Sequence, residues 1–202
     1  MSLILSLAMF IASLVVSTYA NTYATERASN AVTDIFLSNI PIYNVEDIFV
    51  YGPLVFWTFM ILVALASPRT LPFTLKSISL FTIIRAVFVS LTHIGPFPTQ
   101  TIVDTHNIIS SFSVGNDFFF SGHTGLPFLI ALIFWDTWAI RIVCIAASIF
   151  FGIIVLLGHF HYSIDVLSAF FITYSIFRLS QVLFAQDWQR FSAKDNFTAK
   201  IS

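Results

Sequence analysis

The chain has 202 residues, of which 57% are hydrophobic and 9% charged, and its formal net charge is −1. A soluble domain carries about a quarter charged residues, so this composition and a mean hydropathy of +0.89 exclude a soluble fold. The near-zero net charge gives no indication of a nucleic-acid partner. Because apolar residues run through the whole chain, we predict a single, all-α integral membrane domain over residues 1–202.

The apolar stretches, taken in chain order, predict six transmembrane helices, since an α-helix needs about 20 residues to cross a bilayer. The predicted helices cover residues 1–20, 53–66, 73–91, 123–134, 142–158 and 163–185. The polar segments between and after them cover residues 21–52, 92–122 and 186–202. A cleaved signal peptide is the alternative interpretation of residues 1–20, but the basic n-region of such a peptide is missing.

Six spans place both termini on one side of the membrane, and the distribution of basic residues identifies that side as the cytoplasm. Seven basic residues fall on the side of the termini, and they are Arg69, Lys76, Arg141, Arg178, Arg190, Lys194 and Lys200. Only Arg27 and Arg85 fall toward the opposite side. Residues 21–52 and 92–122 are therefore predicted to be exoplasmic, and residues 186–202 are predicted to form a cytoplasmic tail. All five histidines fall on the exoplasmic side, which favours a functional site over unrelated core histidines.

Two short motifs place polar groups beside long apolar runs, where an unpaired polar group is costly. The first motif covers residues 117–124 and contains His123, and the second covers residues 158–166 and contains His161 and Asp165. Enough residues separate the two histidines for one crossing, a turn and a return crossing, so both histidines return to the same membrane surface. Asp165 follows His161 by four residues and therefore shares its helical face.

A phosphate ester is the substrate that best suits these side chains. Asp165 can hold the imidazole of His161 in one tautomer, so that the other ring nitrogen acts as a nucleophile. His123 can protonate the leaving oxygen and later take a proton from the attacking alcohol or water. Arg85 lies about two helical turns before Thr92, near the predicted exoplasmic end of its helix, and can stabilise the phosphoryl oxygens.

Other interpretations of the same residues are less favoured. A single histidine at a membrane interface is often a structural polar residue. Ser121, His123 and Asp165 have the residue types of a serine hydrolase, but Ser121 lies only two residues from His123, so its hydroxyl suits donation to a phosphate oxygen. The remaining interpretation is a metal site built from His123, His159, His161 and Asp165. Their spacing matches no established metal motif, so no metal and no other cofactor is predicted.

The two motifs resemble those of a known enzyme family, the sphingomyelin synthases. Residues 117–124 (Asp-Phe-Phe-Phe-Ser-Gly-His-Thr) are similar to the family's Asp-x-x-Phe-Ser-Gly-His-Thr motif, and residues 161–166 (His-Tyr-Ser-Ile-Asp-Val) resemble its His-Tyr-x-x-Asp-Val motif. Arg85, followed by Thr92 and then by prolines, resembles its Arg-x(6)-Thr segment. The resemblance covers about residues 34–185. These enzymes belong with the type-2 phosphatidic acid phosphatase superfamily, whose members share a six-helix core and an exoplasmic His/His/Asp site.

The resemblance implies roles for individual residues. It implies His161 as the nucleophile, Asp165 as its orienting partner and His123 as the acid and base. The residues that it implies as substrate contacts lie in the two motifs or on the preceding helix, and they are Arg85, Asp117, Ser121, Gly122 and Tyr162. The implied reaction moves a phosphocholine or phosphoethanolamine head group, through a phosphohistidine, from a membrane phospholipid to a lipid alcohol resembling ceramide or diacylglycerol.

The chain departs from the phosphatase branch of that superfamily at two places. Ile154 and Val155 stand where the branch carries a Ser-Arg pair. Its Lys-x(6)-Arg-Pro motif is also missing, since Lys76 and Arg85 are nine residues apart and Ala86 follows the arginine. Those basic residues grip a phosphate monoester dianion, so their loss favours a phosphodiester monoanion and head-group transfer. The alternatives are a lipid phosphate phosphatase or phospholipase C-type hydrolase with the same site, and an inactive lipid-binding protein; a homo-oligomer is compatible with the sequence.

Overall fold

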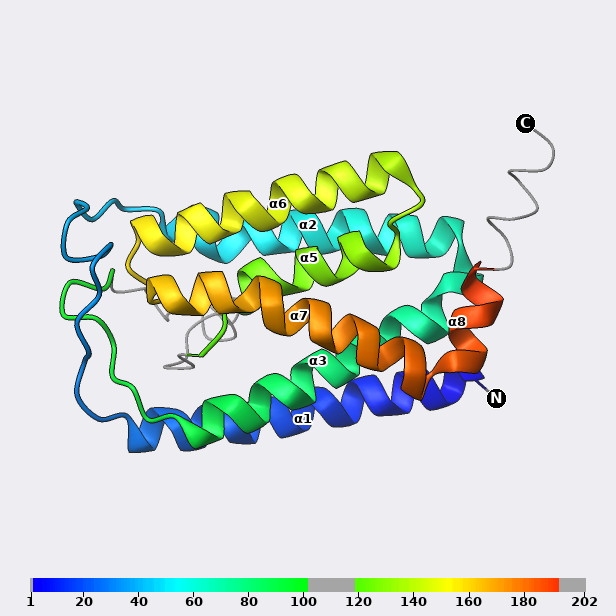
Figure 1. The fold of residues 1–202 in the computed structure, drawn as a ribbon, viewed down its shortest axis with the longest axis horizontal. Helices are drawn as coiled ribbons and strands as arrows, with labels where there is room; N and C mark the ends of the chain where they lie inside the picture. The colour runs from blue at the N-terminus through cyan, green and yellow to red at the C-terminus, as the bar shows by residue number, and fades with distance from the viewer. Residues whose placement is uncertain (1, 102–118, 193–202) are drawn as a thin grey trace.

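The computed structural model describes residues 2–101 and 119–192, and within these ranges the chain forms helices and no strands (Figure 1). The helices are α1 (Ser2–Arg27), α2 (Glu46–Ala66), the 3-10 helix η1 (Pro68–Thr70), α3 (Leu71–Leu91), α5 (Gly122–Ile133), α6 (Trp138–Leu157), α7 (Ser163–Leu183) and α8 (Ala185–Ser192). The long helices run roughly along one direction and form an elongated bundle (Figure 1). The described chain is therefore all-α, as predicted.

Five segments of the described chain are long and apolar enough to cross a membrane, and they are α1, α2, η1 with α3, α6 and α7. Several helices of this kind indicate a multi-pass membrane protein. The span predicted over residues 123–134 also forms a helix, but α5 has 12 residues and a length of about 18 Å. This is shorter than the ~30 Å hydrocarbon core of a bilayer, so α5 alone does not provide a sixth full span.

Helix α5 lies inside the bundle, where α3, α6 and α7 pack around it. Eight of its 12 residues are buried, which explains why an apolar stretch of this length is not a lipid-facing span. Gly125 allows its neighbours to approach closely, because a Cβ atom there would lie 2.8 Å from the Phe81 ring and 2.9 Å from the Thr173 hydroxyl. The interior position of α5 therefore places the first motif, at its start, within the protein.

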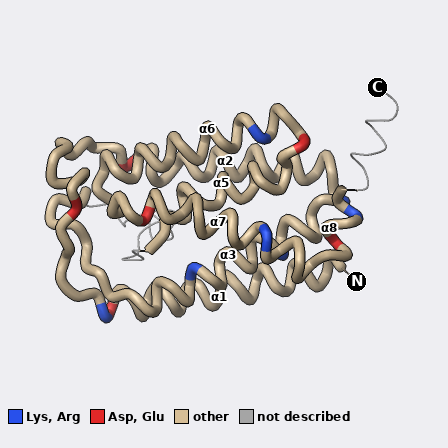
Figure 2. The backbone as a smooth tube through the Cα atoms, viewed as in Figure 1, with Lys and Arg blue, Asp and Glu red and all other residues tan. Residues whose placement is uncertain are grey.

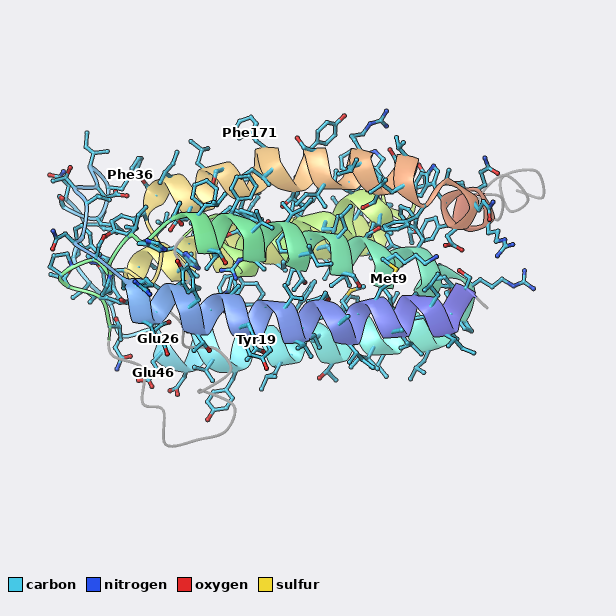
Figure 3. The ribbon with its side chains drawn as sticks, turned by 90° about the horizontal axis from the view of Figure 1, so that it is seen from below. Met9, Tyr19, Glu26, Phe36, Glu46 and Phe171 are labelled. Atoms are coloured by element: carbon cyan, nitrogen blue, oxygen red, sulfur yellow. The ribbon has the colours of Figure 1, made fainter. Side chains whose placement is uncertain are left out.

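Helix α1 packs along α3 through a stripe of small residues. Its buried residues are Ser6, Ser13, Ala20 and Ala24, whose spacing keeps them on one helical face. Small side chains allow two transmembrane backbones to approach closely, which gives van der Waals contact along the whole length. Tyr19, on another face of α1, is 75% exposed and therefore faces lipid in a membrane (Figure 3).

Two helices extend further into the polar segments than predicted. Helix α1 continues to Arg27, beyond residue 20, and the hydroxyls of Thr18 and Thr22 each find a hydrogen-bond partner within the helix, at a carbonyl one turn earlier (3.0 Å). Helix α2 begins at Glu46, before residue 53, and its first turn carries two acidic residues that suit the positive end of a helix dipole. The loop between α1 and α2 is therefore shorter than the predicted segment 21–52.

The bundle has two distinct ends. The loop end consists of residues 28–45, 92–101 and 158–162, which four main-chain hydrogen bonds tie together and to the end of α6. These bonds join Ser29 N to His93 O (2.8 Å), Gly95 N to Asn30 O (3.2 Å), Thr101 N to Gly158 O (3.1 Å) and Tyr43 N to Leu157 O (2.9 Å). The terminal end consists of α8 and the first turns of α1. The acidic residues of the described chain lie near one end or the other (Figure 2).

The terminal end contains a helix where a tail was predicted. Residues 186–202 were expected to be a polar tail, but α8 covers Ala185–Ser192 and packs Phe191 against the bundle. Asp187 Oδ2 pairs with Lys76 Nζ at 2.5 Å, and Asp187 Oδ1 accepts a hydrogen bond from Ser2 Oγ at 2.6 Å. This buried pair joins α3, α8 and the start of α1, and its residues are far along the bundle from the loop end (Figure 1).

Candidate active site

The second motif forms the start of α7. Tyr162 is the N-cap residue, and its backbone N–H donates to Asp165 Oδ2 at 3.1 Å. The same oxygen lies 3.3 Å from His161 Nδ1. Asp165 is 1% exposed and His161 is 4% exposed, so this contact lies out of water. One carboxylate oxygen thus binds both the backbone at the helix start and the imidazole, which fixes the orientation of the ring.

The first motif forms the start of α5 and lies directly against the second. Ser121 is the N-cap residue of α5, and its Oγ accepts a hydrogen bond from Thr124 N at 3.4 Å. The backbone N–H of Ser121 donates to the carbonyl oxygen of Asp165 at 3.0 Å. His123 lies in the first turn of α5, two residues beyond this bond. The structure therefore brings the two motifs, separated by a helical hairpin in the sequence, to one place near the loop end.

Aromatic rings from two other helices pack beside His123. Phe49 of α2 stacks on the His123 ring with a centroid distance of 4.3 Å and an interplanar angle of 21°. Phe49 also stacks on Phe160 at 4.0 Å, and Phe151 of α6 lies edge-on to His123 at 6.3 Å. Phe49 is thus shared between His123 and the segment that leads to His161.

Arg85 extends from α3 to the turn before His123. Its Nε donates to the carbonyl oxygen of Phe120 at 3.1 Å. A Cβ atom at Gly122 would lie 3.5 Å from this Nε and 3.7 Å from the guanidinium carbon. The guanidinium therefore lies in van der Waals range of the start of α5. Arg85 is the cation that the structure places next to the two motifs.

Tyr162, a predicted substrate contact, is buried between the loops and α7. It is 1% exposed, and its hydroxyl donates to Gly95 O at 2.8 Å and accepts from Val32 N at 3.2 Å. Burial raises the pKa of this phenol, so it remains protonated at neutral pH. These contacts make Tyr162 a link between the two loops and α7. Asp117, another predicted contact, lies outside the described residues.

His159 faces away from the pair formed by His161 and Asp165. Its Nδ1 lies 2.6 Å from Thr99 Oγ1, it is 2% exposed, and its φ of 55° is in the left-handed region. Burial lowers its pKa, so the ring is neutral at physiological pH. His93 packs edge-on against Tyr23, and His106 lies outside the described residues. Within residues 2–101 and 119–192, no group of three or more His, Cys, Asp or Glu side chains is arranged to hold a metal.

Sequence reasoning missed two residues of this environment. Phe49 is one of 24 phenylalanines, and nothing in its local pattern distinguishes it from lipid-facing ones. Asp34 accepts a hydrogen bond from the Ser163 N–H at the start of α7, although it lies in the polar segment 21–52, outside both motifs. A buried acid in an otherwise exposed loop is recognisable only once the loop is placed in space.

The fold and this cluster together define a multi-pass helical membrane protein with two imidazoles, a carboxylate and a guanidinium near one end of the bundle. Residues 115–182 match a family model described as PAP2 superfamily C-terminal. The match covers about a third of the chain and includes His123, His161 and Asp165. It supports the PAP2 superfamily and hence a lipid enzyme of the phosphatase or phosphotransferase type. No curated protein and no solved structure matches the chain.

Proposed function

We propose that the protein transfers a phospho-head group between membrane lipids at the exoplasmic face, as sphingomyelin synthases do, through a phosphohistidine at His161. One observation carries this proposal: the Ser121 N–H to Asp165 carbonyl bond of 3.0 Å, which joins the starts of α5 and α7. Because His123 and His161 each lie within two to four residues of that bond, both imidazoles are close to a common point. Two imidazoles flanking one phosphorus atom can supply a nucleophile and a general acid.

The first half-reaction forms the phosphohistidine. With Nδ1–H of His161 directed at Asp165, Nε2 carries the lone pair that attacks phosphorus. A P–N bond forms as the P–O bond to the diacylglycerol breaks, and imidazolium His123 gives its proton to the leaving alkoxide. Asp165 compensates the positive charge that develops on the His161 ring, in the manner of an orienting acid behind a catalytic histidine.

The second half-reaction returns the enzyme to its starting state. Neutral His123 takes the proton from the hydroxyl of an acceptor lipid, whose oxygen attacks phosphorus while the P–N bond breaks. The head group leaves on the acceptor, and His161 recovers its lone pair. In both halves Arg85 lies beside the start of α5, where its guanidinium can stabilise the charge on the non-bridging phosphoryl oxygens.

The charge of the site favours a phosphodiester over a phosphate monoester. No Lys or Arg occurs between Arg85 and Arg141, nor between Arg141 and Arg178, so the sequence around both motifs supplies one nearby cation. Ile154 and Val155, which stand where the phosphatase branch has Ser-Arg, are 6% and 0% exposed. A monoester dianion needs more positive charge than one guanidinium, whereas a diester monoanion is matched by it.

The exoplasmic orientation is supported by where the basic residues lie. Arg69, in η1, and Arg141 and Arg178, near the corresponding ends of α6 and α7, all lie toward the terminal end, as does the Lys76 pair. Under the positive-inside rule the terminal end is then cytoplasmic and the loop end exoplasmic. A donor phospholipid in the outer leaflet would present its phosphate at the depth of the loop end.

The test is transfer by the purified protein. Vesicles with head-group-labelled phosphatidylcholine, with and without ceramide, are incubated with wild type, His161→Ala and a control with His93→Ala at the same end. The proposal expects labelled sphingomyelin-type product only with the acceptor, loss in His161→Ala, and wild-type turnover in the control. Free labelled head group at the same rate with or without ceramide would identify a hydrolase instead, and wild-type turnover by His161→Ala would remove the proposed nucleophile.

A further inference from the structure

One acidic side chain of the loop end is buried although its segment is exposed. Asp34 is 7% exposed, whereas the adjacent Ile35 is 78% exposed. Asp34 Oδ1 accepts hydrogen bonds from the backbone N–H groups of Phe36 at 2.8 Å and Leu37 at 3.1 Å. A carboxylate that bonds to the backbone two residues on stabilises a turn. The turn satisfies Oδ1 and leaves Oδ2 to find a partner elsewhere.

That partner is the start of α7. Asp34 Oδ2 accepts a hydrogen bond from the backbone N–H of Ser163 at 2.6 Å. Ser163 is the first residue of α7, and the N–H groups of a first helical turn have no partner within the helix. Asp34 therefore caps α7 from a distant part of the chain, and its charge lies at the positive end of the helix dipole. Burial acts to raise the pKa of Asp34, but the hydrogen bonds from Ser163, Leu37 and Phe36 outweigh it, so the pKa is lowered and the group is ionised.

The start of α7, which Asp34 caps, lies between the proposed nucleophile and its orienting partner. His161 and Tyr162 precede Ser163 directly, and Asp165 follows it by two residues. Asp165 Oδ2 binds both Tyr162 N and His161 Nδ1, so the separation of His161 and Asp165 depends on the backbone of residues 162–163. A second contact supports the same assembly, since Leu37 and Tyr162 belong to one buried apolar cluster.

We propose that Asp34 is a positioning residue for the transfer reaction, because its bond to Ser163 fixes the backbone from which His161 and Asp165 project. Asp34 acts through Ser163 and not on the reacting phosphorus. The inference rests on the proposed function for the roles of His161 and Asp165. The bond itself can be tested separately from the chemistry.

Three variants isolate this hydrogen bond. Asp34→Asn can keep the turn through its amide oxygen, but it then directs an NH2 donor at the Ser163 N–H, so two donors face each other. Ser163→Pro removes the donor from the opposite side; proline is favoured at the first helical position, and the preceding Tyr162, at φ −69° and ψ 155°, has the extended backbone that proline requires. Ser163→Ala keeps the N–H and removes the hydroxyl, which also hydrogen-bonds Asp34, so this variant measures the side-chain bond alone. Asp47→Asn, at an exposed acid in the first turn of α2, is the control for loss of charge at the loop end.

The measurements are steady-state transfer and hydrogen exchange followed by mass spectrometry. We expect Asp34→Asn and Ser163→Pro each to lower kcat about 10- to 100-fold with KM changed less than about threefold, because a small misplacement of reacting groups costs rate more than binding. Amides of residues 164–168 should exchange faster in both variants, while those of α6 stay unchanged. The double variant Asp34→Asn/Ser163→Pro should be no slower than the slower single variant, since both substitutions remove the same hydrogen bond. Asp47→Asn should behave as wild type, and Ser163→Ala, which loses the hydroxyl bond to Asp34 but keeps the N–H bond, should fall between wild type and Asp34→Asn.

Two results would overturn the inference. If Asp34→Asn and Ser163→Pro both keep the wild-type kcat and the wild-type exchange of residues 164–168, the hydrogen bond between Asp34 and Ser163 does not position the start of α7. Faster exchange throughout α6 and α7 would show a general role in stability and no specific positioning. If the wild-type protein itself transfers no head group, the proposed function fails, and the exchange data alone decide whether Asp34 holds the start of α7.

Discussion

Replacing Asp165 by Asn tests the arrangement of the candidate site most sharply, because the two side chains have the same shape. Asp165 Oδ2 binds Tyr162 N at 3.1 Å and His161 Nδ1 at 3.3 Å, in a position that is 1% exposed. A hydrogen bond between a buried carboxylate and imidazole is charge-assisted and contributes about 1.5–3 kcal/mol, which corresponds to about 10- to 100-fold in rate. An amide also permits the wrong tautomer of the ring, which raises the expected loss of kcat to about 10²- to 10⁴-fold.

The assay is single-turnover formation of labelled enzyme from a head-group-labelled phospholipid, with Asp136→Asn as the matched control. Asp136 is exposed in the turn between α5 and α6, so its loss of charge should leave the rate unchanged. Thermal unfolding of both variants in the same detergent checks that they are folded. A rate for Asp165→Asn within about threefold of wild type would refute the orienting role of this carboxylate.

Three further predictions concern other parts of the structure. Arg85→Lys keeps one charge but loses the planar fork beside the start of α5, and we expect kcat/KM to fall about 10- to 100-fold in the transfer assay; an unchanged value would remove Arg85 from phosphate stabilisation. Lys76→Met removes the closest cation of the buried Asp187 carboxylate and leaves, among the described residues, only the exposed Arg190 at 4.0 Å, so we expect unfolding to cost about 3 kcal/mol less, with most of the loss recovered in Lys76→Met/Asp187→Leu; a melting curve like that of wild type would contradict this. Burial acts to raise the pKa of Asp187, but the hydrogen bonds from Lys76 and Ser2 outweigh burial and lower this pKa from its usual 3.8. The stability that this carboxylate contributes is therefore present above pH 3.8 and should be lost as the pH falls through the lowered pKa of the folded protein. Gly125→Ala would place a methyl group 2.8 Å from the Phe81 ring, and we expect a loss of about 1–3 kcal/mol in stability with no change in KM. A melting curve like that of wild type would show that the Phe81 ring moves aside without cost.

The coarse fold could be read from the sequence because it depends on composition and length. Each predicted apolar range contains a helix, since apolar runs in lipid have no better way to satisfy their backbone. The helix ends could not be placed as well, because α1 continues past its apolar residues through a mostly polar stretch to Arg27. The short length of α5 was predicted, as residues 123–134, but its position inside the bundle was not, because apolar content does not distinguish a residue packed in protein from one in lipid.

The proximity of His161, Asp165 and His123 was predictable because their spacing is local or bridged by one helical hairpin. The partners missing from the prediction come from distant parts of the chain. Phe49 reaches His123 from α2, and Asp34 reaches the start of α7 from the loop after α1. Such contacts depend on how the loops fold over the bundle, and no periodicity in the sequence encodes them.

The central claim is a covalent phosphohistidine at His161, and direct detection of that adduct tests it most simply. Wild-type protein is mixed with labelled phospholipid without acceptor, quenched at alkaline pH to preserve the P–N bond, digested, and analysed by mass spectrometry. The expected result is a head-group phosphate on His161 that disappears when ceramide is added and never forms in His161→Ala. Label on another residue, or wild-type transfer by His161→Ala, would contradict the account.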